Sequence, residues 1–353
     1  MAEEKYFAAS NTSAGFISYF DRVFSPSELS RLYIIKSGAG TGKSSMMRRI
    51  ADAAEKNGRK VVYYYCSSDP YSLDGIVVPS LALGVIDGTA PHMTDPKYPG
   101  AADTILDFYP YLNEKMLTEK RKKIIELTDK NKALHKKSSS YRRFAGLAER
   151  EALSVISGCI DREKLNAAVS RFAAAEKGEG GGKHRQISAF STRGKVRFDT
   201  FEQMSDSVVA VCDEHGAAYL FMNALKAALS KKGVPFYYST ETLLPENCEA
   251  IYLPQTRRSF VITGKPAETD KKDYSKLINM KRFIKADALK EVRGRLRMCE
   301  KTRDLLDAEA ARIIAEAGKV HDELEALYNP AVDFDGVRRE TERVIERELR
   351  IQN

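Results

Sequence analysis

Dense apolar runs of strand length alternate with amphipathic stretches along the first hundred residues. The run RLYIIK (31–36) is followed by glycine-rich sequence and then by apolar residues at helical spacing over 46–54. Two further apolar runs, VVYYYC (61–66) and LALGVI (81–86), have the composition of strands. Strands that alternate with helices in this way predict an α/β fold in which helices cover a parallel sheet.

The pattern changes at about residue 102 and predicts long, charged helices as far as residue 177. The segment GEGGGKH (178–184) predicts a flexible linker, because consecutive glycines have no side chains to pack. The first order then recurs, with a strand at SVVAV (207–211), a helix over 217–233, strands at VPFYYS (234–239) and SFVI (259–262), and helices from about 274 to the end. Such a recurrence suggests an internal duplication.

The glycine-rich sequence after the first apolar run reads SGAGTGKS (37–44), and its later positions fit the phosphate-binding loop. Glycines there let backbone N–H groups surround phosphates, Lys43 supplies a cation, and the following helix begins at the anion. Ser37 stands where the motif has its first glycine, and Gly38 can supply the same backbone freedom. The predicted nucleotide-binding residues are Gly38, Ala39, Gly40, Thr41, Gly42, Lys43, Ser44 and Ser45.

A nucleotide site of this kind also needs ligands for Mg²⁺. The Ser44 hydroxyl is one, and Asp87, which ends the run LALGVID, has the form of a Walker B carboxylate. A turn-forming aspartate before Gly88 is the alternative for Asp87. No glutamate follows Asp87, so hydrolysis is less secure than binding. Further catalytic candidates beside Lys43 and Asp87 are Asp69, Asp74 and His92, each of which also fits a cap, turn or structural role.

Residues 233–254 resemble residues 58–79 without a gap, at an offset of 175 residues, and share a glycine and two prolines at the same spacing. The same offset places Ala218 at the position of Lys43 and Ile262 at that of Asp87. Asp213 and Glu214 would also repel phosphates. We therefore expect a pseudo-NTPase second half, whose Arg257 and Arg258 either act in cis on the first site or are simply solvated.

These observations predict an α/β fold with a P-loop NTPase-like parallel sheet, duplicated, in which a long helical appendage follows each half. The expected segments are 1–177, with an α/β core (1–110) and a basic helical appendage (111–177), a glycine-rich linker (178–184), and 185–353, with a degenerate core (185–270) and a second helical appendage (271–353).

Charge is concentrated in one segment of the chain. Residues 111–150 contain twelve Lys or Arg against five Asp or Glu, so nearly the whole net charge of +8 lies there. Such a run attracts nucleic acid or acidic partners, but a solvated helix face is its commoner explanation. No apolar run is long enough for a membrane helix, and five scattered cysteines without metal-ligand spacing are typical of reduced cytoplasmic proteins.

The stretches LYIIKSGAGTGKSS, YYYCSSDPYSLDGIVVP and LGVIDGTAPHMTDP together resemble an uncharacterised family of bacterial P-loop ATPases built from two tandem NTPase-like halves. The resemblance is strongest over about residues 6–110. It implies binding of ATP or GTP with Mg²⁺ in the cytoplasm, through residues 38–45 and Asp87.

Three functions follow as hypotheses. The first is a Mg²⁺-dependent ATPase or GTPase with one active half, whose helical appendages meet a protein partner. The second is a small-molecule or nucleotide kinase in which the basic helices form a lid and Arg142 or Arg143 clamps the phosphate. The third, not favoured, is a nucleotide-gated module that binds nucleic acid or protein through the basic segment.

Overall fold

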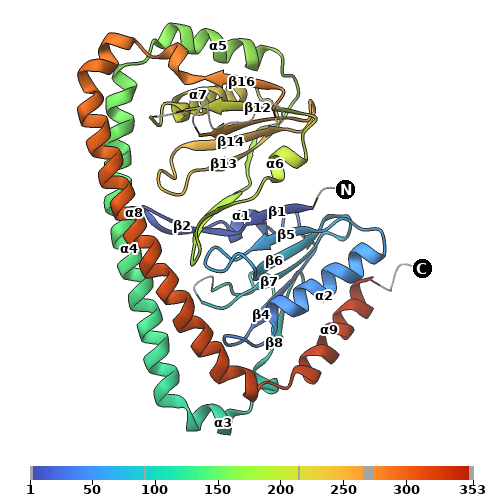
Figure 1. Cartoon of the computed structure of the whole chain (residues 1–353). Coiled ribbons are helices and arrows are strands. Elements are labelled where there is room, and N and C mark those ends of the chain that lie inside the picture. Colours follow the sequence, from blue (N-terminus) through green and yellow to red (C-terminus); the bar gives the residue numbers. More distant parts are fainter. Residues whose placement is uncertain (1–2, 91–92, 214, 265–273, 350–353) are drawn as a thin grey trace.

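The structure, a computed structural model, describes residues 3–90, 93–213, 215–264 and 274–349. Within these residues the chain is α/β and forms two mixed sheets of six strands, each followed by long helices (Figure 1). The first sheet has the order β1-β5-β6-β7-β4-β8, from β1 (Glu4–Phe7), β4 (Arg31–Lys36), β5 (Val62–Tyr65), β6 (Leu73–Val78), β7 (Leu83–Asp87) and β8 (Asp103–Asp107).

The second sheet repeats the order and direction of the first. Its order is β16-β12-β15-β14-β13-β9, from β9 (Gly182–His184), β12 (Ser207–Cys212), β13 (Phe236–Thr240), β14 (Cys248–Leu253), β15 (Arg258–Thr263) and β16 (Lys276–Asn279). The pairing register shifts between Tyr64 and Tyr65 in one sheet and between Ser239 and Thr240 in the other. These positions are 175 residues apart, as a duplicated α/β fold would place them.

The prediction of parallel sheets is wrong in part, because both sheets are mixed. β6 is antiparallel to β5 and β7, and β14 is antiparallel to β13 and β15. The cause is the length of the connections. A parallel crossover needs a dozen or more residues, and only 66–72 separate β5 from β6 and only 79–82 separate β6 from β7.

Several strands lie where the sequence pattern did not predict a strand, among them the central strands β6 and β14. β8 and β16 occupy stretches that were expected to be helical or to begin a helix, and β9 lies inside the glycine-rich segment 178–184. β1 is an edge strand parallel to β5. Two small hairpins and two short helices complete the cores: β2 (Ala9–Thr12) with β3 (Gly15–Ser18), β10 (Ser188–Ser191) with β11 (Gly194–Arg197), α1 (Phe20–Val23) and α6 (Thr200–Gln203).

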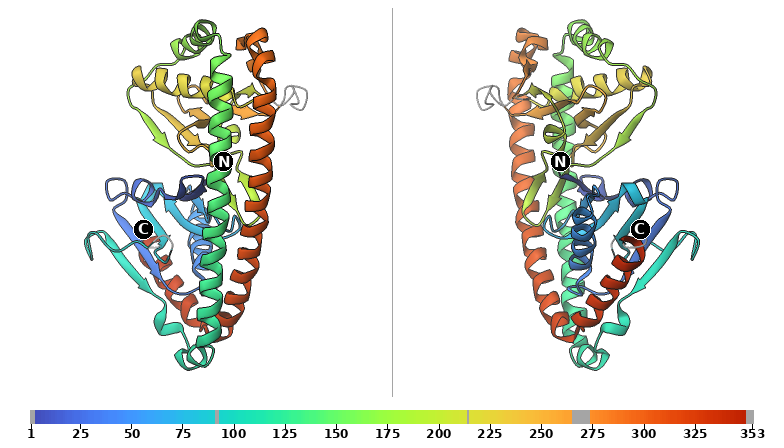
Figure 2. Two further views of the ribbon diagram at one scale, coloured as in Figure 1. Left: turned by 90° about the vertical axis from the view of Figure 1, so that its left-hand side faces the viewer. Right: turned by 90° about the vertical axis from the view of Figure 1, so that its right-hand side faces the viewer.

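The longest helices pack side by side and run along one side of both sheets (Figure 2). The remaining helices are α2 (Lys43–Lys56), α3 (Glu114–Glu119), α4 (Arg121–Gly158), α5 (Arg162–Ala174), α7 (Ala218–Lys231), α8 (Ala286–Tyr328) and α9 (Phe334–Leu349). Short 3₁₀ turns lie at Pro79–Leu81, Tyr109–Tyr111, Met280–Phe283 and Asn329–Ala331. None of the helices in the described part of the chain has the length and apolarity to span a membrane.

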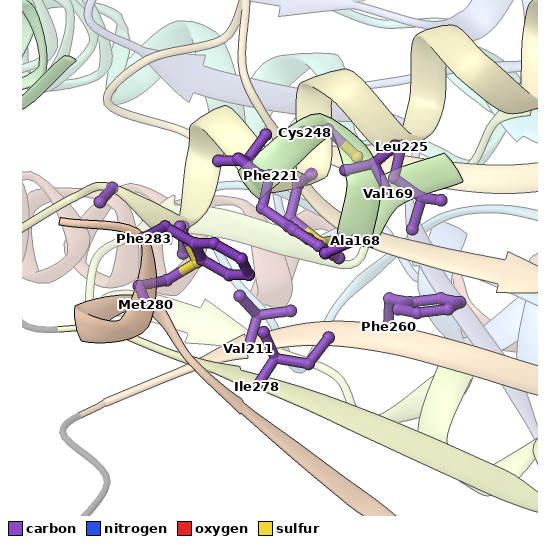
Figure 3. Packing of buried hydrophobic residues seen from close by; sticks show 14 of the residues in the cluster. Ala168, Val169, Val211, Phe221, Leu225, Cys248, Phe260, Ile278, Met280 and Phe283 are labelled. Atoms are coloured by element: carbon purple, nitrogen blue, oxygen red, sulfur yellow. The ribbon is translucent and has the colours of Figure 1, made fainter. Parts of the chain in front are cut away.

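Each helical appendage crosses to the opposite sheet. α4 begins beside the first sheet and ends beside the second, where α5 packs on α7. Figure 3 shows Ala168 and Val169 of α5 against Phe221 and Leu225 of α7. α8 runs the other way, and α9 packs on α2 of the first half. Each apolar core therefore contains a helix from the other half of the chain.

The remaining faces of the two sheets meet each other. Residues such as Ile34 and Tyr64 of the first sheet share one buried cluster with Ala250 and Tyr252 of the second. The order of layers is thus helices, sheet, sheet, helices, with α4 and α8 along one side (Figure 1). The carboxyl ends of the parallel strands of the first sheet remain beside the end of α8.

His184 predicts an acid-sensitive contact where the halves meet. Its ring lies between Tyr19, at 4.3 Å between centroids, and Tyr238, at 5.2 Å, and burial followed by the charge of Arg22 lowers its pKa to about 4. The unfolded chain would titrate this histidine at about 6.5. Keeping it neutral therefore costs nothing above pH 6.5, and stability is lost as the pH falls from 6.5 towards 4.

We expect His184→Phe to reduce the difference in unfolding free energy between pH 7 and pH 4 by about 3 kcal/mol. Urea denaturation of both proteins at the two pH values measures it. An unchanged pH dependence in the variant would show that His184 titrates normally in the folded protein.

Candidate functional site

The candidate site lies at the carboxyl ends of three adjacent parallel strands. β4 pairs with β7 on one side and β8 on the other, and Ile35 of β4 is in register with Asp87 of β7. The loop 37–42 follows β4 and leads into α2. Ligands bind at this edge in open α/β sheets. The strand, loop and helix expected from the sequence are therefore present, with Asp87 on the neighbouring strand.

Backbone conformation in the loop depends on its glycines. Gly40 has φ +62° and Gly42 has φ +88°, and Gly42 is the N-cap of α2, so the positive end of the helix dipole faces the loop. Ser37 does not have a positive φ, and it is buried. Its hydroxyl donates to Thr41 Oγ1 at 2.7 Å, which gives this serine a structural role in place of the motif's first glycine.

Lys43, at the start of α2, lies close to Asp87, at the end of β7. The Lys43 ammonium donates to the Gly38 carbonyl oxygen and lies 3.6 Å from Asp87 Oδ2, and both side chains are largely buried. Asp87 Oδ1 accepts hydrogen bonds from the Thr89 amide at 2.9 Å and hydroxyl at 2.6 Å. One carboxylate oxygen of Asp87 thus stabilises the turn after β7, which is the turn-forming role considered for this residue. The other oxygen faces Lys43.

The other candidates have different surroundings. The Ser44 hydroxyl accepts a hydrogen bond from the Leu73 amide at 3.0 Å, which brings the start of β6 beside α2, and Ser45 is exposed. Asp69 accepts from the Tyr71 amide at 3.1 Å and so stabilises the turn before β6. Asp74 lies within β6 rather than in a loop, and it is buried there. Burial of the Cys66 thiol raises the pKa of that thiol, and the charge of Asp74 raises it further. His92 lies outside the described residues.

The end of α8 also belongs to the site, which sequence analysis missed. A Cβ atom placed on Gly38 would lie 2.8 Å from the Tyr328 ring. One placed on Gly40 would lie 2.7 Å from Asn329 Oδ1 and 3.1 Å from Glu325 Cβ. Ala39 packs on the cluster formed by α4 and α8. These residues are almost 300 positions from the loop, and no motif in the sequence connects them.

Charge at the end of α8 interacts with the loop. His321 Nε2 lies 3.4 Å from Glu325 Oε1. The hydrogen bond from His321 is the main cause of the lowered pKa of Glu325. Lys43 and the Gly40 backbone amide lower this pKa further. Glu325 in turn raises the pKa of His321. The negative charge of Glu325 is therefore favoured by His321 first and by the loop 37–45 second.

The corresponding loop of the second half has no such cation. α7 begins at Ala218, and Asp213 Oδ2 accepts from the Ala218 amide at 2.7 Å, so a carboxylate caps this helix. Ile262 lies within β15, at the position that Asp87 has in β7. Glu214 lies outside the described residues. The second half therefore lacks counterparts of Lys43 and Asp87, as the sequence predicted, and the first amide of its helix α7 is already bound to a carboxylate.

Three of the four arginines proposed for phosphate contacts pair with acidic side chains elsewhere, and Arg143 is exposed on α4. Arg257 pairs with Asp206 at 2.9 Å and Arg258 with Glu176, which follows α5, at 3.2 Å. Arg142 is buried between α4 and α8, where it pairs with Asp307 and donates to Thr242 Oγ1 at 2.9 Å. Neither a finger in cis nor a clamp by Arg142 agrees with these contacts.

The donor set fits Mg²⁺ only together with phosphates. Among the described residues there is no group of three or more His, Cys, Asp or Glu side chains placed to hold a metal. Mg²⁺ commonly takes one or two protein ligands, with water and phosphate oxygens for the rest. Ser44 and Asp87 supply a hydroxyl and a carboxylate of that kind, from either side of the loop lysine.

Comparison with known proteins adds no relative: no family model, curated protein or solved structure matches the chain.

Contact between α8 and the loop can be tested through stability. Gly40→Ala and Gly100→Ala both introduce a side chain at positive φ, +62° and +75°, which costs roughly 1–2 kcal/mol. Only at Gly40 would the methyl group also meet the Glu325 backbone and Asn329, and such overpacking adds about 1–3 kcal/mol. We expect chemical denaturation to show the larger loss for Gly40→Ala. Equal losses would mean that α8 does not rest on the loop.

Proposed function

We propose that this protein binds a nucleoside triphosphate, ATP or GTP, together with Mg²⁺ at the loop 37–45, and hydrolyses it at this single site. The observation that supports the proposal is the placement of Lys43, the first residue of α2, 3.6 Å from Asp87, the last residue of the strand β7 beside β4. The family resemblance and the P-loop class of the fold are part of the same proposal.

The roles follow from the chemistry of each group. Backbone N–H groups of residues 40–45 and the dipole of α2 would bind the phosphates. Lys43, now bound to the Gly38 carbonyl, would exchange that neutral partner for phosphate oxygens. Ser44 and Asp87 would hold Mg²⁺, which would supply positive charge to offset the negative charge of the phosphates.

Hydrolysis needs a group that orients water. Gly88 follows Asp87, Asp69 stabilises a turn and Asp74 is buried in β6, so none of them is an evident base. Water oriented by the loop and metal alone reacts slowly in P-loop proteins, and large accelerations come from added catalytic groups. We therefore propose slow turnover in the isolated protein, with catalysis depending on a rearrangement or a protein partner.

The two alternatives have less support. Of the two arginines considered for a kinase lid, Arg142 is buried and pairs with Asp307 of α8, whereas Arg143 is exposed on α4. Most charges of the basic segment are exposed along α3 and α4, which is typical of a solvated helix face and does not by itself favour nucleic acid. For the location we propose the cytoplasm, which supplies nucleotides and agrees with five free cysteines.

Calorimetric titration with Mg²⁺ and ATP or GTP tests the proposal, with free phosphate followed on the same samples. We expect one site per chain, weakened about 10–100-fold by Lys43→Ala, because a hydrogen bond to a charged group contributes about 1.5–3 kcal/mol. Lys56→Ala is the matched control, since Lys56 is exposed in the last turn of the same helix.

In the same titration Asp87→Asn should reduce the gain in affinity that Mg²⁺ provides. Binding that is equal in wild type, Lys43→Ala and Lys56→Ala, or no binding by any of them, would contradict a nucleotide site at this loop.

A further inference from the structure

Glu325 lies against Gly40, in the loop proposed to hold phosphate. Its Cβ and Cα are 3.1 and 3.3 Å from the position of a Cβ on Gly40, and its carboxylate lies 3.4 Å from His321 Nε2. His321 first, and then Lys43 and the Gly40 amide, lower the pKa of this carboxyl group. Backbone amides and a lysine of this kind are the groups that bind polyphosphate. The protein thus presents an anion of its own to the donors that a nucleotide requires.

A bound nucleotide and this arrangement exclude each other. Triphosphate would bring several negative charges next to the carboxylate, and like charges at short distance repel. The Tyr328 ring lies against Gly38, so the outer side of the loop is also covered. Nucleotide binding therefore requires the end of α8 to move away from the loop.

The second half contains a related contact, in which a glutamate carboxylate lies beside a glycine of the loop before α7. Glu149 of α4 has its Oε1 3.5 Å from the Cβ position of Gly216, which precedes α7. The offset of 175 residues carries Glu149 to position 324, next to Glu325. Each crossing helix thus places a glutamate against the loop of the opposite half.

The two glutamates differ in what holds them. The side chain of Glu149 is 9% exposed and pairs with Arg303 at 2.6 Å. Burial raises the pKa of Glu149. Glu325 and its partner His321 are 40% and 47% exposed. Exposed ion pairs contribute little to stability. The contact is therefore firm at the loop without a lysine and readily released at the loop with one.

We propose that the end of α8 is an autoinhibitory plug, in which Glu325 takes the place of phosphate at the loop and must be displaced when nucleotide binds. The proposal rests on the proposed function of this site and concerns its regulation. Because α8 begins at the second sheet, the plug makes nucleotide affinity depend on how the second half holds this helix.

Glu325→Ala tests the plug directly. A Mg²⁺-bound, non-hydrolysable ATP analogue is titrated into full-length wild type, Glu325→Ala and Glu323→Ala. Glu323 is exposed two residues away on the same helix, so its variant removes the same charge without touching the loop. We expect affinity to rise by about tenfold or more for Glu325→Ala only, because apparent affinity is reduced by the fraction of molecules that are closed.

Other outcomes separate the two proposals. Equal affinities in all three proteins would overturn the plug and leave the nucleotide site intact, and weaker binding by Glu325→Ala would make Glu325 a ligand instead of a competitor. No binding by any of the three would overturn the proposed function and the plug with it. If Glu325→Ala does not fold, Glu325→Gln keeps the side chain's size and removes its charge, with Glu323→Gln as control.

Discussion

Antiparallel pairing of α4 and α8 is the interaction on which the rest of the structure depends. Small residues such as Ala310 and Ala317 let the two helices approach closely, and the Ser138 hydroxyl donates to the Ala310 carbonyl at 2.9 Å. The Asn131 side-chain amide donates a hydrogen bond to the Ala317 carbonyl oxygen at 2.8 Å. Because each helix continues to the opposite sheet, this pairing delivers α5 to the second core and α9 to the first. Neither sheet has its full helical cover without the other half of the chain.

This exchange also explains why a second half without a phosphate loop would be retained. It supplies α8, whose start is packed on the second sheet and whose end lies on the loop of the first. A rigid helix that joins two sites is a physical route by which a change at one can alter the other. In our account, the second half sets the position of α8, and α8 sets access to the loop.

Local patterns in the sequence predicted the elements that carry the loop. β4, α2, β7, α7 and β12 lie where apolar spacing placed them, and the 175-residue offset relates the two sheets. β6 was not predicted as a strand, and its antiparallel direction follows from connections too short for parallel crossovers. The short strands β8 and β16 have too few apolar residues to stand out before a long helical pattern.

The crossing of the helices, and with it the contact of Glu325 and Tyr328 with the loop, could not be predicted. An amphipathic pattern shows that a helix has an apolar face, and it does not show which sheet that face covers. Within the site, the sequence correctly associated Lys43 with Asp87, because the loop before α2 follows β4 and Asp87 ends the adjacent parallel strand β7. Asp69 stabilises a turn, which was its alternative role, and Asp74 is buried within β6, a strand that the sequence pattern did not predict.

Hydrogen exchange of the wild-type protein, with and without Mg²⁺ and ATP, tests whether α8 covers the loop until nucleotide binds. The account predicts that nucleotide slows exchange of backbone amides over residues 38–45, speeds it over 321–329 as α8 leaves the loop, and leaves 215–222 unchanged. Slower exchange at 215–222, or no change at 38–45 at saturating nucleotide, would contradict a single phosphate site that α8 covers.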